Sequence, residues 1–219
     1  MYKSIYCIGD SHISVFDNRR ELCLHKTFYI NGIYKIFPIY GSLAYNLGKE
    51  DHQRRIKFLN ILQINNITKD DLIILSFGEV DCRNHIIKQK EKQNITIEQS
   101  SKLCVDNYFK FVLYLKILYN NICVIGPHLA NTYEKNNYYG TLEDRYIVTY
   151  HFNKILEEYS KKNNICFISS FNDTCSFENN NLVFNNSKYI NRPDNTGMHL
   201  SINMYDFFNK KINILTIKK

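Results

Sequence analysis

The sequence predicts a three-layer α/β domain with a mainly parallel central sheet. Short apolar runs recur along the chain, and those at 71–78 and 121–128 are nearly continuous, which is typical of strands buried on both faces of a parallel sheet. Longer stretches between these runs space their apolar residues as helices do. Strands alternating with helices of this length predict crossover connections, with helices on both faces of the sheet.

The individual elements follow from these patterns. We expect strands at 4–9, 71–78, 121–128 and 163–171, the first because alternating apolar residues end in Gly9. We expect helices at 52–64, 100–119, 141–162 and 201–215. Helical spacing predicts one shared face in each of three helices. The residues are Ile56, Leu59 and Gln63, with Leu62 nearby, in the first helix, Leu103, Tyr108, Phe111, Leu115 and Leu118 in the second, and Tyr146, Thr149, Phe152 and Leu156 in the third.

Length and composition limit the class of protein. A chain of 219 residues has enough material for one substantial core, so we expect a single domain over 1–219. A hydrophobic fraction of 44% excludes a disordered chain, and no apolar run approaches the ~20 residues needed to cross a bilayer. The apolar run at the N-terminus is too short for a signal peptide. These observations predict a cytoplasmic protein that does not enter membranes.

Charge and cysteine content argue against a nucleic-acid-binding protein and against a zinc-binding protein. The net charge is +7, from 28 basic and 21 acidic residues, but the lysines are scattered, which argues against a nucleic-acid binder while leaving it as an alternative. The 7 cysteines form no Cys-x-x-Cys pair and no zinc-ligand spacing. We therefore expect reduced, mostly buried thiols, with no metal and no cofactor.

Four short segments carry the functional signal. They read GDSH at 9–12, IYGSLAYNL at 39–47, SFGEVDCR at 76–83 and DNTGMHLS at 194–201. In order and spacing they resemble the four sequence blocks of SGNH/GDSL hydrolases, and the third block is similar to a variant found in relatives linked to polysaccharide modification. The resemblance spans nearly the whole chain. It implies a flavodoxin-like α/β/α sandwich, with Ser11 as nucleophile and His199 as base.

The chemistry of these residue types agrees with that assignment. A serine hydroxyl becomes a useful nucleophile when an imidazole accepts its proton, and a carboxylate that orients the imidazole completes a triad. Asp194 is the nearest carboxylate upstream of His199, although the family places its acid at the position held here by Thr196. The alternatives are a Ser-His dyad without Asp194, and a Ser11 that only caps a helix.

The resemblance also implies an oxyanion hole built from the backbone N–H groups of Ser11 and Gly41 and an asparagine side chain. Val80 occupies the asparagine position and has no donor, so Arg83 is our candidate replacement. We also place Asp10, His12, Glu79 and Asp81 in the oxyanion and substrate-binding region. Alternatively, Glu79, Asp81 and Arg83 form a network that shapes the pocket.

These residues together predict a serine ester hydrolase. The expected reaction removes a short acyl group, such as acetyl, from a carbohydrate or glycoconjugate through an acyl-Ser11 intermediate. A sugar O-acyltransferase with the same Ser-His groups is one alternative, because an alcohol can resolve an acyl-enzyme in place of water. The other is a non-catalytic carbohydrate-binding module on a decayed hydrolase fold, suggested by Val80 and Thr196.

Overall fold

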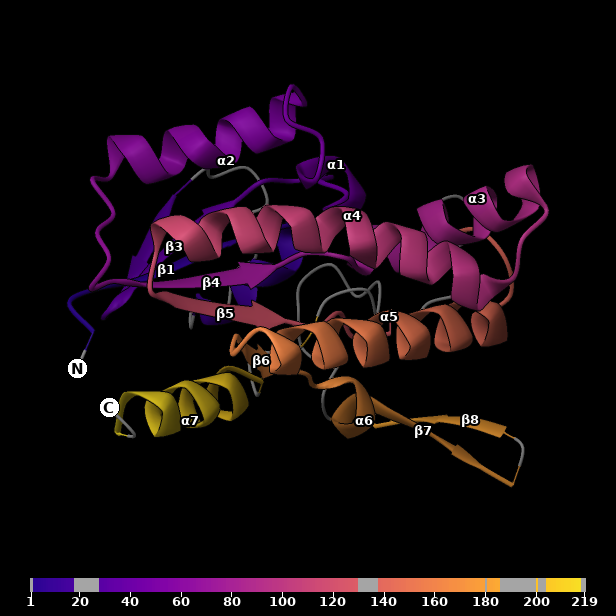
Figure 1. Ribbon diagram of the computed structural model, residues 1–219. Helices are drawn as coiled ribbons and strands as arrows, with labels where there is room; N and C mark the ends of the chain where they lie inside the picture. The colour runs from indigo at the N-terminus through magenta and orange to yellow at the C-terminus, as the bar shows by residue number, and fades with distance from the viewer. Residues whose placement is uncertain are drawn as a thin grey trace.

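The computed structural model describes residues 2–17, 28–129, 138–179, 181–185, 200 and 204–217. Its centre is a 6-stranded sheet in the order β2-β3-β1-β4-β5-β6. The pairs joining β3, β1, β4, β5 and β6 are all parallel, and β2 runs antiparallel to β3 at one edge. Without β2, this is the strand order of flavodoxin-like folds. The predicted fold class is confirmed (Figure 1).

The strands are β1 (Ile5–Gly9), β2 (Tyr29–Asn31), β3 (Tyr34–Pro38), β4 (Leu72–Ser76), β5 (Asn121–Ile125), β6 (Cys166–Ile168), β7 (Cys175–Glu178) and β8 (Asn181–Phe184). The helices are η1 (Ser11–Phe16), α1 (Ala44–Leu47), α2 (Gln53–Ile64), η2 (Asp81–His85), α3 (Ile86–Gln93), α4 (Ile97–Leu118), α5 (Leu142–Lys162), α6 (Phe171–Thr174) and α7 (Met204–Ile217). The β7–β8 hairpin extends away from the main sheet in Figure 1.

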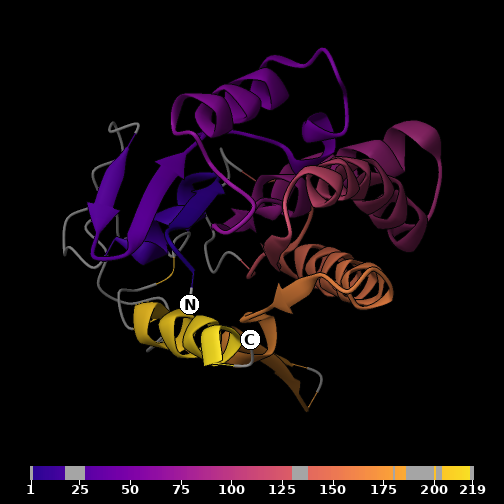
Figure 2. The ribbon, with the colours of Figure 1, turned by 60° about the vertical axis from the view of Figure 1, so that its left-hand side comes forward.

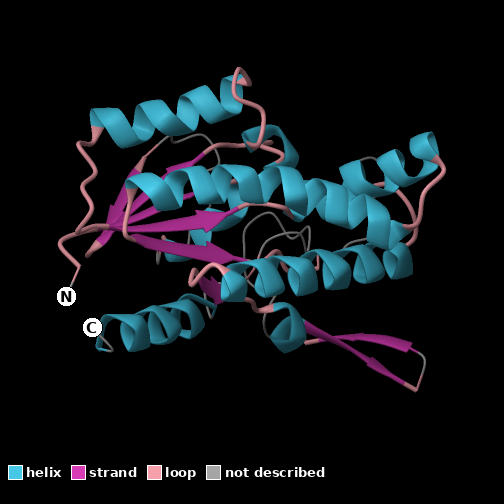
Figure 3. Cartoon of the chain, viewed as in Figure 1, coloured by secondary structure: helices cyan, strands magenta, loops and turns pink. Residues whose placement is uncertain are grey.

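Helices cover both faces of the sheet. Figure 2 shows α7 on the side opposite α2 and α4, and Figure 3 shows the same layers with the strands between them. The long helices α4 and α5 begin with reciprocal side-chain caps, formed by Thr96 with Gln99 and by Thr141 with Asp144. Such capping boxes satisfy N–H groups that the first helical turn leaves unpaired. The sequence thus determines where both crossover helices start.

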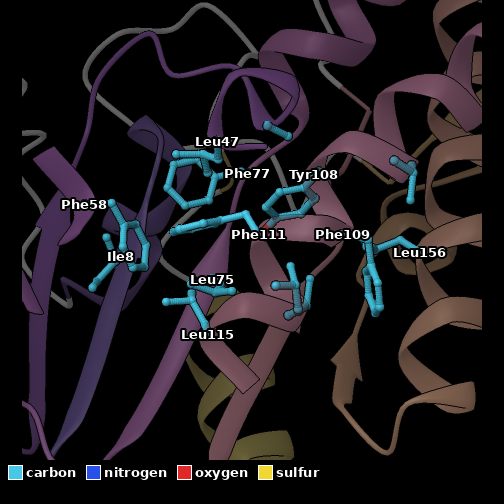
Figure 4. Close-up of a cluster of buried hydrophobic side chains, with 14 of the residues drawn as sticks. Ile8, Leu47, Phe58, Leu75, Phe77, Tyr108, Phe109, Phe111, Leu115 and Leu156 are labelled. Atoms are coloured by element: carbon cyan, nitrogen blue, oxygen red, sulfur yellow. The ribbon is translucent and has the colours of Figure 1, made fainter. Parts of the chain in front are cut away.

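Alternation along the strands divides the core into two clusters. Ile8 and Leu75 face α2, α4 and α5, and Figure 4 shows them beneath aromatic side chains that include Phe58 and Phe111. Their strand neighbours Cys7, Ile74, Cys123 and Ile125 face the other way, where η1 and α7 contribute Phe16, Met204 and Phe208. A strand buried on both faces therefore needs apolar residues at every position, as the sequence has.

Two of the predicted helix faces need correction. In α2 the buried residues are Arg55, Phe58 and Leu62, while Ile56 is 47% exposed and Gln63 is exposed. Arg55 is buried because its guanidinium lies over the rings of Phe111 and Tyr114, at 5.3 and 4.9 Å from their centroids.

In α4 the expected Tyr108, Phe111 and Leu115 are buried, but Leu103 and Leu118 are 50% and 40% exposed. In α5, Thr149, Phe152 and Leu156 are buried as predicted, and Tyr146 is partly buried. Leu118 is the last residue of α4, where the helix meets solvent, and Leu103 lines a groove on the helix surface.

The cysteines in the described residues are free thiols, as expected, and all of them except Cys166 are buried. Cys123 and Cys166 are register partners on β5 and β6, with 3.2 Å between their sulfur atoms. None of the helices in the described ranges combines the length and apolar character that a membrane span requires.

Candidate active site

The candidate site lies at the carboxyl edge of the sheet, where β1 has β3 on one side and β4 on the other. Gly9 at the end of β1 pairs in register with Pro38 and with Ser76. The connections from β1 and β4 leave toward opposite faces of the sheet, so this is the topological switch point at which α/β proteins bind ligands. The first three sequence blocks all follow these strand ends.

Ser11 is the first residue of η1 and is partly exposed. The residue that caps this helix is Asp10, whose Oδ1 accepts a hydrogen bond from the backbone N–H of His12 at 2.9 Å. The reading of Ser11 as the capping residue is therefore wrong. The backbone N–H of Asp10 donates to the carbonyl of Ser76 at 2.9 Å, which ties the turn before Ser11 to the end of β4.

Gly41 lies in the loop between β3 and α1. Its φ of +64° is in the left-handed region, which a glycine adopts without steric cost. The residue is exposed, and among the described residues no atom lies within 4 Å of the position that a Cβ atom would take.

Asp81 is fully buried and holds the helix that follows this loop. Its carboxylate accepts hydrogen bonds from the backbone N–H groups of Ala44 at 2.6 Å and Tyr45 at 3.2 Å, and from the Cys104 thiol at 3.3 Å. Burial raises the pKa of Asp81 to about 6, and these hydrogen bonds oppose the increase. The residue before α1, Leu43, has no side-chain acceptor of its own, so Asp81 supplies the cap from another part of the chain.

Glu79 is also buried, and two basic side chains share its carboxylate. Its Oε2 lies 3.1 Å from Nε2 of His12, and its Oε1 lies 2.9 Å from Nε of Arg83. Burial acts to raise the pKa of Glu79, but His12 and Arg83 lower it to about 2. The same ion pair raises the pKa of Arg83 against the effect of burial. Glu79 thus forms a network with His12 and Arg83, whereas the hydrogen bonds of Asp81 go to Ala44, Tyr45 and Cys104, so the expected network of Glu79, Asp81 and Arg83 is found only in part.

His12 packs against a second histidine, a contact that the spacing of the two residues in the sequence does not predict. The rings of His12 and His128 meet edge to face, with 4.6 Å between their centroids. His128 follows β5, is 3% exposed, and is the last residue of the segment 121–128 in which a strand was expected. Both imidazoles lie inside the protein.

A small cavity connects these groups. Its lining includes Asp10, His12, Glu79, His128 and Ser170, and its volume of about 10 Å³ is close to what one water molecule needs. Within the described residues, Oδ2 of Asp10 and Oγ of Ser170 make no hydrogen bond. Burial and the charge of Glu79 raise the pKa of Asp10 well above its usual range. Ser170 was not anticipated, since no sequence block contains it.

The final block is only partly visible. His199, Asp194 and Thr196 lie outside the described residues. Leu200, the residue after His199 in the sequence, is 4% exposed and lines the same cavity. Val80 lies just before η2 and is partly buried. Among the described residues, no group of three or more His, Cys, Asp or Glu side chains is arranged to hold a metal ion.

The sheet order and the position of the site define a three-layer α/β/α protein of the flavodoxin-like class, with its polar site at the switch point. Solved structures of hydrolases have this fold. One is a GDSL-like lipase from Bacteroides thetaiotaomicron, with a TM-score of 0.62 and 16% identity over 99% of this chain and 88% of the other.

A putative acylhydrolase from Bacteroides fragilis matches with a TM-score of 0.59 and 14% identity, over 99% of this chain and 87% of the other. A catalytic mutant of an acetylxylan esterase from Geobacillus stearothermophilus matches with a TM-score of 0.52 and 12% identity, over 94% and 90%. No protein-family model and no curated protein matches the sequence. At these identities the likeness establishes the fold.

Proposed function

We propose that the protein is a serine ester hydrolase that removes a short acyl group from a carbohydrate. The observation that carries this proposal is the position of Ser11, which begins the segment after β1 at the switch point, with the Gly41 loop following the neighbouring strand. A nucleophile at the carboxyl end of a central strand is accessible to substrate, while the sheet behind it stays rigid.

The reaction follows from the groups assigned to the site. His199 accepts the proton of the Ser11 hydroxyl, and the Ser11 oxygen attacks the acyl carbon of the ester. The backbone N–H groups of Ser11 and Gly41 bind the oxyanion, and the sugar alcohol leaves with the proton from His199. Water, activated by His199, then releases the acyl group from Ser11. Asp194 orients the imidazole.

Two buried carboxylates position this machinery. Asp81 holds α1, which begins three residues after Gly41, and Glu79 connects His12, next to Ser11, to Arg83. We assign Arg83 as the side-chain donor of the oxyanion hole, in place of the asparagine whose position Val80 occupies. Its guanidinium has several N–H donors and keeps its charge at all working pH values. Asp10 fixes the turn before Ser11 through its backbone and its carboxylate.

The acetylxylan esterase among the structural neighbours supports an acylated carbohydrate as substrate, and the acylhydrolase supports the reaction class. The direct test is turnover of p-nitrophenyl acetate and of an acetylated oligosaccharide by the purified protein, with Ser11→Ala as the inactive variant. Ser14→Ala is a matched control, since Ser14 lies in the same helix and its hydroxyl donates to the backbone carbonyl of Ser11 at 2.7 Å. Equal turnover by wild type and Ser11→Ala would refute the proposal.

Two alternatives give different outcomes. A sugar O-acyltransferase would form acylated product from an acyl donor and an unmodified sugar faster than it releases free acid. A non-catalytic module would bind acylated sugar but leave Ser11 unlabelled by a fluorophosphonate, whereas the hydrolase forms a covalent adduct at Ser11 that mass spectrometry locates.

A further inference from the structure

A groove of about 830 Å³ lies between α3, α4 and the C-terminal end of α5. Its volume falls within the range of about 300–1,000 Å³ that is typical of ligand sites. Of the residues assigned to the reaction, Ser11, Gly41 and Arg83 are described by the structure, and none of the three lines the groove. The groove is therefore a second concave surface, separate from the small cavity beside Ser11.

The groove shares a support with the candidate active site. Tyr45 and Cys104 line the groove, and both contact the Asp81 carboxylate, Tyr45 through its backbone N–H and Cys104 through its thiol. Asp81 holds the helix that follows the Gly41 loop. His85, four residues after Asp81, also lines the groove and packs against Tyr45 with 5.0 Å between ring centroids. One end of the groove thus lies beside the second and third sequence blocks.

The lining of the groove includes exposed apolar side chains. Leu103 and Leu113 remain 50% and 37% exposed although they lie in a concave surface, and Tyr45 and Tyr159 add aromatic rings. Exposed apolar side chains inside a groove indicate a surface that a ligand covers. Tyrosine rings provide flat apolar faces with a polar edge, which suits the C–H faces of sugar rings.

Side-chain amides form the polar part of the lining, and several of them are oriented by hydrogen bonds to other groups of the protein. Nε2 of Gln93 donates to Oε1 of Gln89 at 3.0 Å, and Nδ2 of Asn107 donates to the Tyr45 carbonyl at 2.5 Å. Nδ2 of Asn163 donates to the Tyr159 carbonyl at 2.8 Å. Each bond leaves the other half of an amide for a ligand, and amides both donate to and accept from hydroxyl groups.

The charge of the lining favours an anion. Its carboxylate, Asp106, accepts from Lys102 at 2.7 Å and from the Tyr159 hydroxyl, and is thereby neutralised. Lys110 and Lys162 also line the groove, and neither has a carboxylate within ion-pair distance in the part of the chain that the structure describes. The net charge of +7 adds a long-range attraction for acidic ligands.

We propose that this groove binds an acidic oligosaccharide, the glycan part of the acylated substrate, and so holds the polymer while an ester group reaches Ser11. The role of the glycan as part of the substrate rests on the proposed function. Its binding to the groove does not. A purely apolar ligand would leave the amides and lysines unpaired, which costs affinity.

Binding is tested without catalysis, using the full-length Ser11→Ala protein and two oligosaccharides of equal length, tetragalacturonate and maltotetraose. Isothermal titration is expected to detect tetragalacturonate binding that weakens as salt is added, with maltotetraose weaker by about tenfold or more, because the lysines pair only with the acid groups. Equal affinity for the two sugars, or no binding of either, would overturn the proposal.

Variants place the ligand in the groove. Replacing both lysines, as Lys110→Gln with Lys162→Gln, is expected to weaken tetragalacturonate binding by about tenfold or more. Leu103→Glu is expected to do the same, since it puts a carboxylate in the groove. Ile117→Glu is the matched control, because Ile117 lies on the same helix, is 80% exposed and does not line the groove. Unchanged binding in the groove variants would refute the assignment.

Turnover separates this inference from the proposed function. With Ser11 intact, the groove variants are expected to lower kcat/KM for acetylated oligogalacturonide while leaving p-nitrophenyl acetate turnover unchanged. Sugar binding without turnover of either ester would refute the hydrolase and retain the groove. Turnover of both esters at wild-type rates in the groove variants would retain the hydrolase and refute the groove.

Discussion

Oε2 of Glu79 lies 3.1 Å from Nε2 of His12, so the segment after β4 is joined to the segment after β1 by a contact inside the protein. Both side chains are at most 5% exposed. Nε of Arg83 donates to the same Oε2 at 3.0 Å and lies 2.9 Å from Oε1. A buried carboxylate shared by two basic groups is costly to disturb, because removing the charge leaves its partners without compensation.

Glu79→Gln is expected to lower the free energy of unfolding at neutral pH by about 3–5 kcal/mol, since it removes the charge that pairs with His12 and Arg83 in a buried position. Chemical denaturation followed by circular dichroism measures the change. Lys102→Met is the control, because it removes an ion pair that is exposed to solvent. The Lys102–Asp106 pair is exposed, and its loss is expected to cost at most about 1 kcal/mol. A Glu79→Gln protein as stable as Lys102→Met would contradict the role given to Glu79.

The same carboxylate predicts a pH dependence with a definite sign. The pKa of Glu79 falls from 4.5 to about 2 on folding, so its stabilising effect is complete above pH 4.5 and is lost as the pH falls toward 2. The difference in unfolding free energy between wild type and Glu79→Gln is therefore expected to shrink over that interval. Denaturation curves at a series of acidic pH values measure it. If the difference in unfolding free energy stays constant from pH 4.5 to 2, then folding does not lower the pKa of Glu79.

Asp81, two residues further on, is expected to respond in the opposite direction. Its pKa rises from 3.8 to about 6 on folding, so its contribution is complete below pH 3.8 and is lost as the pH rises through 6. Compared with Asp81→Asn, the wild-type protein should lose stability between these values. Denaturation of both proteins across this range tests the sign, and a gain in wild-type stability on raising the pH would contradict it.

Asp81 also has an expected effect on activity. Asp81→Ala leaves the N–H groups of Ala44 and Tyr45 without their acceptor, at a cost of about 1–3 kcal/mol, and frees the start of α1. If Asp81 positions the Gly41 loop, ester turnover should fall in the folded variant, and Asp81→Asn, which retains one acceptor oxygen, should restore part of it. Equal activity of the Ala and Asn variants would indicate a purely structural residue.

The elements predicted from the sequence are those whose pattern follows from burial. The strand at 71–78 appears as β4 and the helix at 141–162 as α5, because continuous apolar runs and 3.6-residue spacing determine both. The face of α2 could not be predicted in the same way. Arginine is charged, so a hydrophobic pattern does not place it on a buried helix face. Only the tertiary structure shows that Arg55 lies over two aromatic rings. The short β2, β3 and the β7–β8 hairpin have patterns too brief to distinguish from loops.

The site was predictable to a similar extent. The sequence blocks place Ser11, Gly41 and Glu79 after neighbouring strands, because parallel strands end at the same edge. Which side chains face each other was not predictable, since spacing alone cannot show that Asp81 reaches α1 while Glu79 reaches His12. Ser170 follows β6 outside every block, so nothing in the sequence pointed to it. The roles of His199 and Asp194 stay predictions.

Gly9 gives a last test of how the sheet positions Ser11. A Cβ atom at Gly9 would lie 2.9 Å from Cβ of Ile13 and closer still to the Ser76 carbonyl oxygen, so β1 and β4 would have to separate. Gly9→Ala is expected to cost about 3 kcal/mol in unfolding free energy by overpacking, and to reduce ester turnover by moving Ser11.

Gly32→Ala is the matched control for Gly9→Ala. Gly32 has a φ of +56°, and no atom of the described residues lies within 4 Å of the position that its Cβ atom would take. Its substitution is therefore expected to cost the backbone strain, about 1 kcal/mol, and to leave turnover unchanged. Thermal unfolding and p-nitrophenyl acetate assays on both variants decide the matter. If Gly9→Ala is no less stable than Gly32→Ala and equally active, then the close approach of β1 to β4 does not determine where Ser11 lies.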